Sequence, residues 1–137
     1  MDPNRAEFDE VAVNRTFGFE RVRSDVDGAE IRLRPTPALT QHYGVIHGGV
    51  IAALADTAAV YCVLPALATG ERMTSIEFKL NFTAGARPGP DPLVATARPA
   101  KVGRTVAVVH VDVRQGATLV ATGLFTYLRL AAPGRAG

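Results

Sequence analysis

The longest apolar stretch of the sequence covers residues 50–67 and holds one charged residue, Asp56. Alanine, valine, leucine, isoleucine and threonine occupy most of its other positions, so a helix built from it would have no polar side. A helix that is apolar on every side packs inside a protein rather than on its surface. The pattern therefore predicts a buried central helix.

Alternating apolar and polar positions predict strands on both sides of this helix. The clearest alternation covers residues 74–83, and we expect its apolar face to meet the helix. That face consists of Ile76, Phe78, Leu80 and Phe82. An Asp-Gly turn within residues 25–28 predicts a hairpin between the first two strands. The remaining expected elements are a short helix at residues 5–14 and strands at residues 17–23, 29–34, 93–100, 105–114 and 118–130.

The order of these elements is two strands, one long helix and then four strands joined mostly by short turns. An antiparallel sheet of about six strands wrapped around the helix satisfies this order, because each alternating strand can then cover its apolar face. The predicted fold class is therefore α+β. A chain of 137 residues suits a single domain. We place this domain at residues 15–130, after a lead-in segment at residues 1–14 and before a flexible tail at residues 131–137.

Composition and charge narrow the classes of function. A net charge of +2 with mixed signs is too weak to favour nucleic acid or an anionic membrane as a partner. A pI near 9.0 still leaves mild attraction for anionic ligands such as phosphorylated cofactors. The single cysteine, Cys62, allows no disulfide framework. Residues 1–10 are unlike a signal peptide, and Asp56 and Pro65 weaken the apolar stretch as a membrane span. We expect a soluble, cytoplasmic protein.

The start of the apolar stretch, His47-Gly48-Gly49, is a candidate site for binding negative charge. Two glycines keep side chains away from the first free backbone N–H groups of the helix, where its macrodipole is positive. Further along, Asp56 has no Lys, Arg or His within two turns to compensate its burial. An oxyanion site and a carboxylate in apolar surroundings together indicate acyl transfer. The alternative is a helix that only packs tightly through its glycines, with Asp56 hydrogen-bonded to Thr57 or to a neighbouring strand.

The spacing of Gly48 and Asp56 indicates a site shared by two chains. The two residues are eight positions apart on one expected helix, which separates them by about 12 Å along its axis. A general base must reach its water through a hydrogen bond, and an oxyanion donor must lie about 3 Å from the oxygen. Since one chain cannot bring both groups to one carbonyl, we expect the active site at a dimer interface.

These features resemble the hotdog-fold acyl-CoA thioesterases, especially their PaaI-type, phenylacetate-pathway branch. The resemblance covers roughly residues 15–130 and rests on His47-Gly48-Gly49, on Asp56 nine residues after the histidine, and on Gly103-Arg104 before a valine-rich strand. It implies a helix enclosed by an antiparallel sheet, and two subunits whose sheets join into one layer as a homodimer or half of a homotetramer. The implied substrate is a small, aryl or medium-chain acyl-CoA.

The resemblance also implies a role for each matching residue. The Gly48 N–H would bind the thioester carbonyl, while His47 would shape the loop and help to hold that carbonyl. Gln41 would position the thioester or the water, and Asp56 would act as nucleophile or general base. The remaining implied contacts are a hydroxyl beside the water from Ser75 or Thr74, the second glycine Gly49, and, near the coenzyme A phosphates or adenine, Lys101, Gly103 and Arg104.

Two other classes of function stay open. One is a hotdog hydratase or dehydratase acting on enoyl or hydroxyacyl thioesters, and the other is a non-catalytic acyl-CoA-binding module. No zinc-ligand spacing and no G-x-S-x-G motif occur in the sequence, so we expect neither a metal site nor an α/β-hydrolase. No cofactor is expected beyond the coenzyme A of the substrate.

Overall fold

The central element is the helix α2, Gly48–Val63, which a single 3-10 turn, Leu64–Ala66, extends. The structure of the protein is a computed structural model, and it describes residues 7–134. The predicted central helix is confirmed, and it ends where Pro65 removes a backbone donor. By length and mean hydropathy of 1.7, Gly48–Ala66 is apolar enough to cross a membrane. In this fold it is the core helix instead, because one side of it is buried against the sheet.

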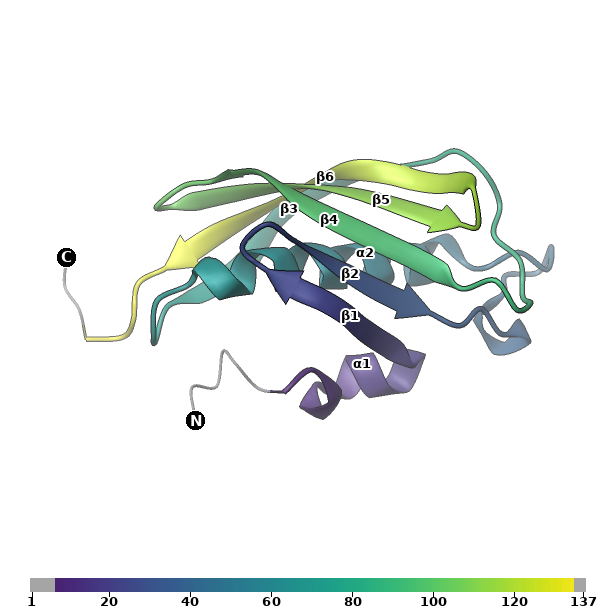
Figure 1. Ribbon diagram of the computed structural model, residues 1–137, viewed down its shortest axis with the longest axis horizontal. Coiled ribbons are helices and arrows are strands. Elements are labelled where there is room, and N and C mark those ends of the chain that lie inside the picture. The colour runs from purple at the N-terminus through teal and green to yellow at the C-terminus, as the bar shows by residue number, and fades with distance from the viewer. Residues whose placement is uncertain (1–6, 135–137) are drawn as a thin grey trace.

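Six antiparallel strands form one sheet in the order β1-β2-β4-β5-β6-β3 (Figure 1). This arrangement confirms the expected α+β hotdog architecture. Strands β4, β5 and β6 follow one another as hairpins, while β3 pairs with β6 at the far edge of the sheet. The strand bounds are β1 Phe19–Asp25, β2 Gly28–Leu33, β3 Arg72–Phe82, β4 Leu93–Val102, β5 Val106–Gln115 and β6 Thr118–Leu130.

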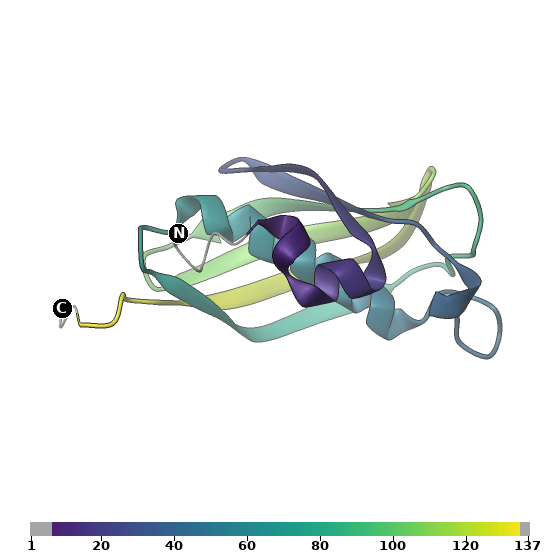
Figure 2. The same ribbon diagram turned by 90° about the horizontal axis from the view of Figure 1, so that it is seen from below.

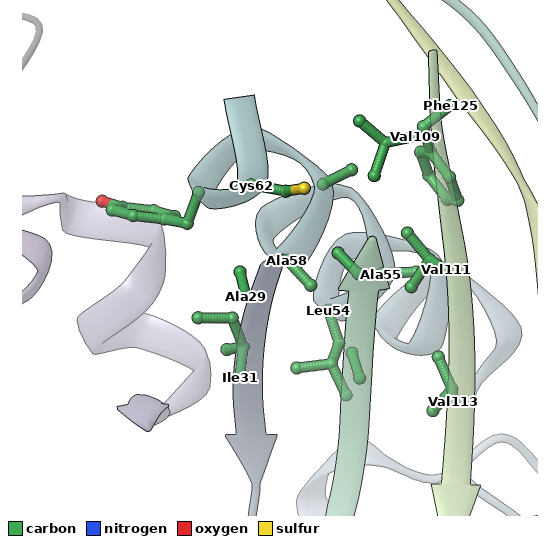
Figure 3. Close-up of a cluster of buried hydrophobic side chains, with 14 of the residues drawn as sticks. Ala29, Ile31, Leu54, Ala55, Ala58, Cys62, Val109, Val111, Val113 and Phe125 are labelled. Carbon is green, nitrogen blue, oxygen red and sulfur yellow. The ribbon is translucent and has the colours of Figure 1, made fainter. Parts of the chain in front are cut away.

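The core lies between α2 and the sheet at β2, β4 and β5. Alanines Ala55 and Ala58 on α2 are fully buried, and their small side chains let the helix backbone approach the strands closely. Strand residues that alternate along β2 and β5 face them, and several converge on this layer in Figure 3. The fully buried residues of this layer include Leu54 from α2 and, from the strands, Ala29, Ile31, Val109, Val111 and Val113.

The N-terminal elements differ from the prediction. A 3-10 turn at Phe8–Glu10 is followed by the helix α1, Ala12–Phe17, so the helix begins and ends later than the expected range 5–14. The first strand begins at Phe19 rather than at residue 17, because Gly18 takes a φ of +71° and ends α1. In Figure 2, α1 lies across α2 on the side away from the sheet. Predictions for residues 1–6 and 135–137 fall outside the described residues, and the domain bounds stay a prediction.

The expectation that the apolar face of β3 meets the helix holds only at the end of the strand, where the Phe82 ring lies over Gly48 at the start of α2. Ile76, Phe78 and Phe82 are 55%, 48% and 53% exposed. The helix packs under β2, β4 and β5, whereas β3 is the edge strand next to β6, and only Phe78 stacks on a core ring, that of Phe125. The apolar alternation was read correctly, but it does not specify what covers the face. Strand β3 therefore presents an apolar face and an open edge within the described residues.

Candidate active site

The N-terminus of α2 presents one free backbone donor. His47 is the N-cap, and its Nδ1 accepts a hydrogen bond of 2.8 Å from the Gly49 N–H. The N–H groups of Val50 and Ile51 both donate to the His47 carbonyl oxygen, at 3.0 and 3.2 Å. Within residues 7–134 the Gly48 N–H donates no hydrogen bond. The amide that the resemblance assigns to the thioester carbonyl is thus the one left unsatisfied in the first turn.

A cleft of about 400 Å³ opens beside this amide and is lined by Gln41, Gly48 and Phe82, among others. The Phe82 ring covers Gly48 so closely that an added Cβ would lie 3.3 Å from the ring atom Cζ. Gln41 lies in a small loop closed by its own N–H, which donates to the Val45 carbonyl at 2.8 Å. Its side-chain Oε1 accepts from the Tyr43 N–H, so the NH2 group is the part of Gln41 that can serve a ligand. We call this the Gly48 cleft.

Asp56 has a partner that the sequence analysis missed. The hydroxyl of Tyr127 on β6 donates to Oδ1 of Asp56 at 2.5 Å and lies 3.3 Å from its backbone carbonyl oxygen. Burial, and then the negative charge of Asp56, raise the pKa of Tyr127 far above its usual range, so the phenol stays protonated. A signal was available: Tyr127 shares the inward alternation of Phe125, and a buried tyrosine hydroxyl needs a partner. The alternative that Asp56 bonds to a neighbouring strand is correct in that respect.

The carboxylate is nevertheless not sealed inside the protein. Asp56 is partly exposed and lines a second cleft, of about 330 Å³, between α2 and the N-terminal segment. The rest of its lining is mostly apolar, with Val13 from the N-terminal segment, Val60 and Leu64 from the helix and its extension, and Met73 from β3. We call this the Asp56 cleft.

Strand register separates the two hydroxyl candidates of β3. Ser75 pairs with Tyr127, and Thr74 pairs with Leu128. Because paired residues of antiparallel strands share a face and Tyr127 faces the helix, Ser75 lies on the helix side of the sheet and Thr74 on the other. Of the two, only Ser75 shares the face of the sheet that carries the Tyr127–Asp56 contact.

The residues expected near coenzyme A lie at the opposite end of α2 from Gly48. Lys101 is the next-to-last residue of β4, and Gly103 and Arg104 lie in the turn to β5. The side chains of Lys101 and Arg104 are exposed. Arg129 ties this turn to the helix end, donating to the carbonyl oxygens of Gly103 at 2.9 Å and Ala66 at 3.2 Å. Within one chain, these residues are not brought together with the Gly48 cleft.

The two clefts share no lining residue. Gly48 and Asp56 both belong to α2, so the axial separation of about 12 Å holds in the structure. A single chain therefore offers an amide donor in one cleft and a carboxylate in the other, and the site at a dimer interface stays a prediction.

Other reactive side chains lie away from these clefts. Burial raises the pKa of the Cys62 thiol to about 11, so it is protonated at neutral pH and a poor nucleophile. His110 is on the sheet face opposite the helix, with Nδ1 3.8 Å from an oxygen of Asp112. Residues 7–134 contain no group of three or more His, Cys, Asp or Glu placed to hold a metal ion. The predicted lack of a metal site remains a prediction.

Comparison with known proteins gives this site a family. The family model of the thioesterase superfamily matches residues 43–122. This range includes α2, which contributes to both clefts, and most of the sheet. The chain belongs to the thioesterase superfamily. A protein of Deinococcus radiodurans, provisionally named an esterase, is 37% identical over 101 residues. That match covers 73% of this chain and 65% of the relative, so the chain spans about two thirds of the relative's length.

Solved structures that are similar to this chain agree with its fold and with the PaaI-like resemblance. A conserved protein of Pseudomonas aeruginosa is 30% identical, with a TM-score of 0.78 over 87% of this chain and 94% of that one. A phenylacetic acid degradation-related thioesterase candidate of Ralstonia eutropha is 28% identical, with a TM-score of 0.82 over 91% of this chain and 95% of that one. The expected relationship to phenylacetate-pathway-like thioesterases is confirmed.

Proposed function

We propose that this protein is an acyl-CoA thioesterase whose active site forms between two copies of the chain. The observation that carries the proposal is the division of one helix between two clefts, with the free Gly48 N–H in one and the Asp56 carboxylate in the other. Membership of the thioesterase superfamily supports hydrolysis of a thioester. Each complete site would combine Gly48 with Asp56 of the partner subunit.

The chemistry follows from what these groups can do. The Gly48 N–H and the positive end of the helix macrodipole stabilise negative charge on the thioester oxygen. The NH2 group of Gln41 orients the thioester or the water, and Asp56 either takes the proton of that water or attacks the carbonyl itself. A thiolate is a good leaving group, so the reaction needs little acid assistance, no metal and no cofactor besides the coenzyme A of the substrate. Label from H2-18O found in Asp56 after a single turnover would identify direct attack.

The lining of the Asp56 cleft supports an apolar acyl group. Val60 and Leu64 follow Asp56 at one-turn intervals, and Met73 adds a flexible apolar wall. A volume of about 330 Å³ suits a small, aryl or medium-chain acyl group. Coenzyme A phosphates would lie near the exposed cations Lys101 and Arg104, in keeping with the net charge of +2.

The surface of β3 supports the required second copy. Its open edge can pair with another strand, and its exposed Ile76, Phe78 and Phe82 form an apolar face of the kind that marks an interface. The proposal is a homodimer or a dimer of dimers, located in the cytoplasm, with no nucleic-acid or membrane partner.

The deciding experiment measures hydrolysis of a panel of short, aryl and long acyl-CoAs through the free thiol that hydrolysis releases. Asp56→Ala should lower kcat by about a thousandfold or more, and Asp27→Ala, which removes an exposed turn carboxylate, should leave it unchanged. Binding of acyl-CoA without turnover would support a non-catalytic module instead. Turnover of enoyl-CoA to a hydroxyacyl-CoA would support a hydratase.

A further inference from the structure

We propose that Tyr127 is the positioning residue of the Asp56 carboxylate, holding Oδ1 through its hydroxyl so that Oδ2 faces the reacting water or carbonyl. This inference rests on the proposed thioesterase function. Its physical basis is the contact between the Tyr127 hydroxyl and Asp56 Oδ1 at 2.5 Å.

The support of Tyr127 is rigid. Its ring is 1% exposed and belongs to β6, which is paired on both sides, with Ala107 of β5 and Ser75 of β3 as its direct partners. A side chain held between two strands cannot follow small movements of a loop, so its hydroxyl is a fixed point for the carboxylate. The hydroxyl thereby connects the last strand to the middle of α2, across 71 residues of sequence.

Asp56 needs such a donor because its surroundings offer little else. Among the described residues that line its cleft, Tyr61 is the only other titratable group, and none is a cation. Cys62, the neighbour of Tyr61 on α2, lies near Tyr127 and carries a protonated thiol. A single phenol can therefore set the orientation of the carboxylate.

One proton on the hydroxyl serves one oxygen. A carboxylate has two oxygens with about four lone-pair sites, so a donor on Oδ1 leaves Oδ2 able to accept a proton or to attack. The raised pKa of Tyr127 keeps that proton on the phenol at neutral pH. Tyr127 thus acts as a permanent donor and not as an acid or base in the reaction.

Tyr127→Phe removes the donor and keeps the ring. Loss of orientation should lower the plateau kcat by about tenfold, with KM within about twofold. Tyr43→Phe removes the same atom from a ring that is 76% exposed, and should change neither quantity.

A second variant avoids any doubt about folding. Site-specific 3-fluorotyrosine at position 127 keeps both the ring and the hydroxyl, so kcat should stay within about threefold of the wild-type value while Tyr127→Phe loses about tenfold. This recovery by the hydroxyl is the expected result, because a role of the ring alone would leave both variants fully active. A kcat within about twofold of the wild-type value in Tyr127→Phe, or an equal loss in both variants, would overturn the proposal.

The hydrogen bond to Asp56 can also be followed without activity, by carbon-13 NMR of its labelled carboxyl group at neutral pH with Asp56→Asn for assignment. The chemical shift of that carbon should differ between Tyr127→Phe and the wild-type protein, and Tyr43→Phe should leave it unchanged. If the wild-type protein hydrolyses no acyl-CoA, the proposed function fails, and this chemical shift still decides whether Tyr127 holds the carboxylate. An active enzyme with equal chemical shifts in Tyr127→Phe and the wild-type protein would refute the role of Tyr127 alone.

Discussion

The Nδ1 atom of His47 accepts the Gly49 N–H at 2.8 Å, and this bond leaves Gly48 as the free donor of the helix start. Because Nδ1 accepts, the proton of the neutral imidazole is on Nε2, which can itself donate to a bound carbonyl. The cap at Nδ1 thus leaves two groups available as donors, the Gly48 N–H and the Nε2–H of His47. This relationship gives physical content to the role of His47 implied by the family resemblance.

Alanine substitutions at the two glycines should separate catalysis from stability. A Cβ at position 48 would lie 3.3 Å from the Phe82 ring, beside the free amide, and we expect Gly48→Ala to lower kcat about a hundredfold without loss of stability. A Cβ at position 49 would lie 2.9 Å from His47 Nδ1 and should displace the cap, lowering stability by about 1 kcal/mol. Steady-state kinetics and urea unfolding measure both. Wild-type kcat in Gly48→Ala would show that the substrate does not occupy the space beside this amide.

Mixed dimers should recover activity from two inactive variants. If each site takes Gln41 from one chain and Asp56 from the other, a dimer of Gln41→Ala with Asp56→Asn contains one intact site and one doubly altered site. The measurement is activity after co-expression with two affinity tags and tandem purification, which leaves only mixed dimers. Because one of the two sites of each mixed dimer is intact, activity should return to about half of the wild-type value. Purified mixed dimers with no recovery would place both groups of a site in one chain.

A charge on the exposed face of β3 should disrupt the dimer. Ile76 is 55% exposed on the edge strand, and in an interface Ile76→Glu would bury an unpaired carboxylate. We expect the dimer dissociation constant, measured by analytical ultracentrifugation, to rise at least about a hundredfold. Thioesterase activity should be lost with the dimer. Val26→Glu is the matched control, since Val26 is 63% exposed in the turn between β1 and β2. A dimer that survives in Ile76→Glu would mean that another surface joins the subunits.

Narrowing the Asp56 cleft should shift the choice of acyl group. Val60 is one helical turn beyond Asp56, and Val60→Phe would fill part of the space of about 330 Å³. We expect kcat/KM to fall about tenfold for the largest accepted acyl-CoA and to stay within about twofold for acetyl-CoA. Val22→Phe, at a half-exposed position of β1, is the control. An equal loss for every acyl-CoA would indicate general damage rather than selection by the cleft.

The ion pair between Arg129 and Glu71 predicts a pH-dependent contribution to stability. The hydrogen bond from Arg129, at 2.7 Å, is the main cause that holds the pKa of Glu71 below its usual value. Because the folded-state pKa is the lower one, the stabilisation is present at neutral pH and is lost as the pH falls below about 4.5. Glu71→Gln should therefore be less stable than the wild-type protein by roughly 0.5 kcal/mol at pH 7, and this difference in stability should be smaller at about pH 3.

Urea unfolding at both pH values measures this difference, and Glu20→Gln, at an exposed position of β1, should show none. A stability difference in Glu71→Gln that is the same at both pH values would show that charge on Glu71 is not its cause.

Hydrophobic patterning by itself determined the central helix, the six strands and the one carboxylate in the apolar stretch. These follow from the sequence because period and local turn chemistry are properties of neighbouring residues. The motif His47-Gly48-Gly49 and the distance to Asp56 were likewise readable, since a helix has a fixed rise per residue. The same local rules could not place the start of β1, which depended on Gly18 ending α1.

Only the tertiary structure decided what each face meets. Alternation shows that Ile76 and Phe78 share a face, but the strand order puts that face at the edge of the sheet, beyond the helix. Alternation also indicates that Tyr127 faces inward, but it does not reveal that the Tyr127 hydroxyl reaches Asp56. Register, not spacing, placed Ser75 opposite Tyr127. Contacts between elements far apart in the chain depend on how the strands are ordered and packed, and no local pattern of side chains encodes that order.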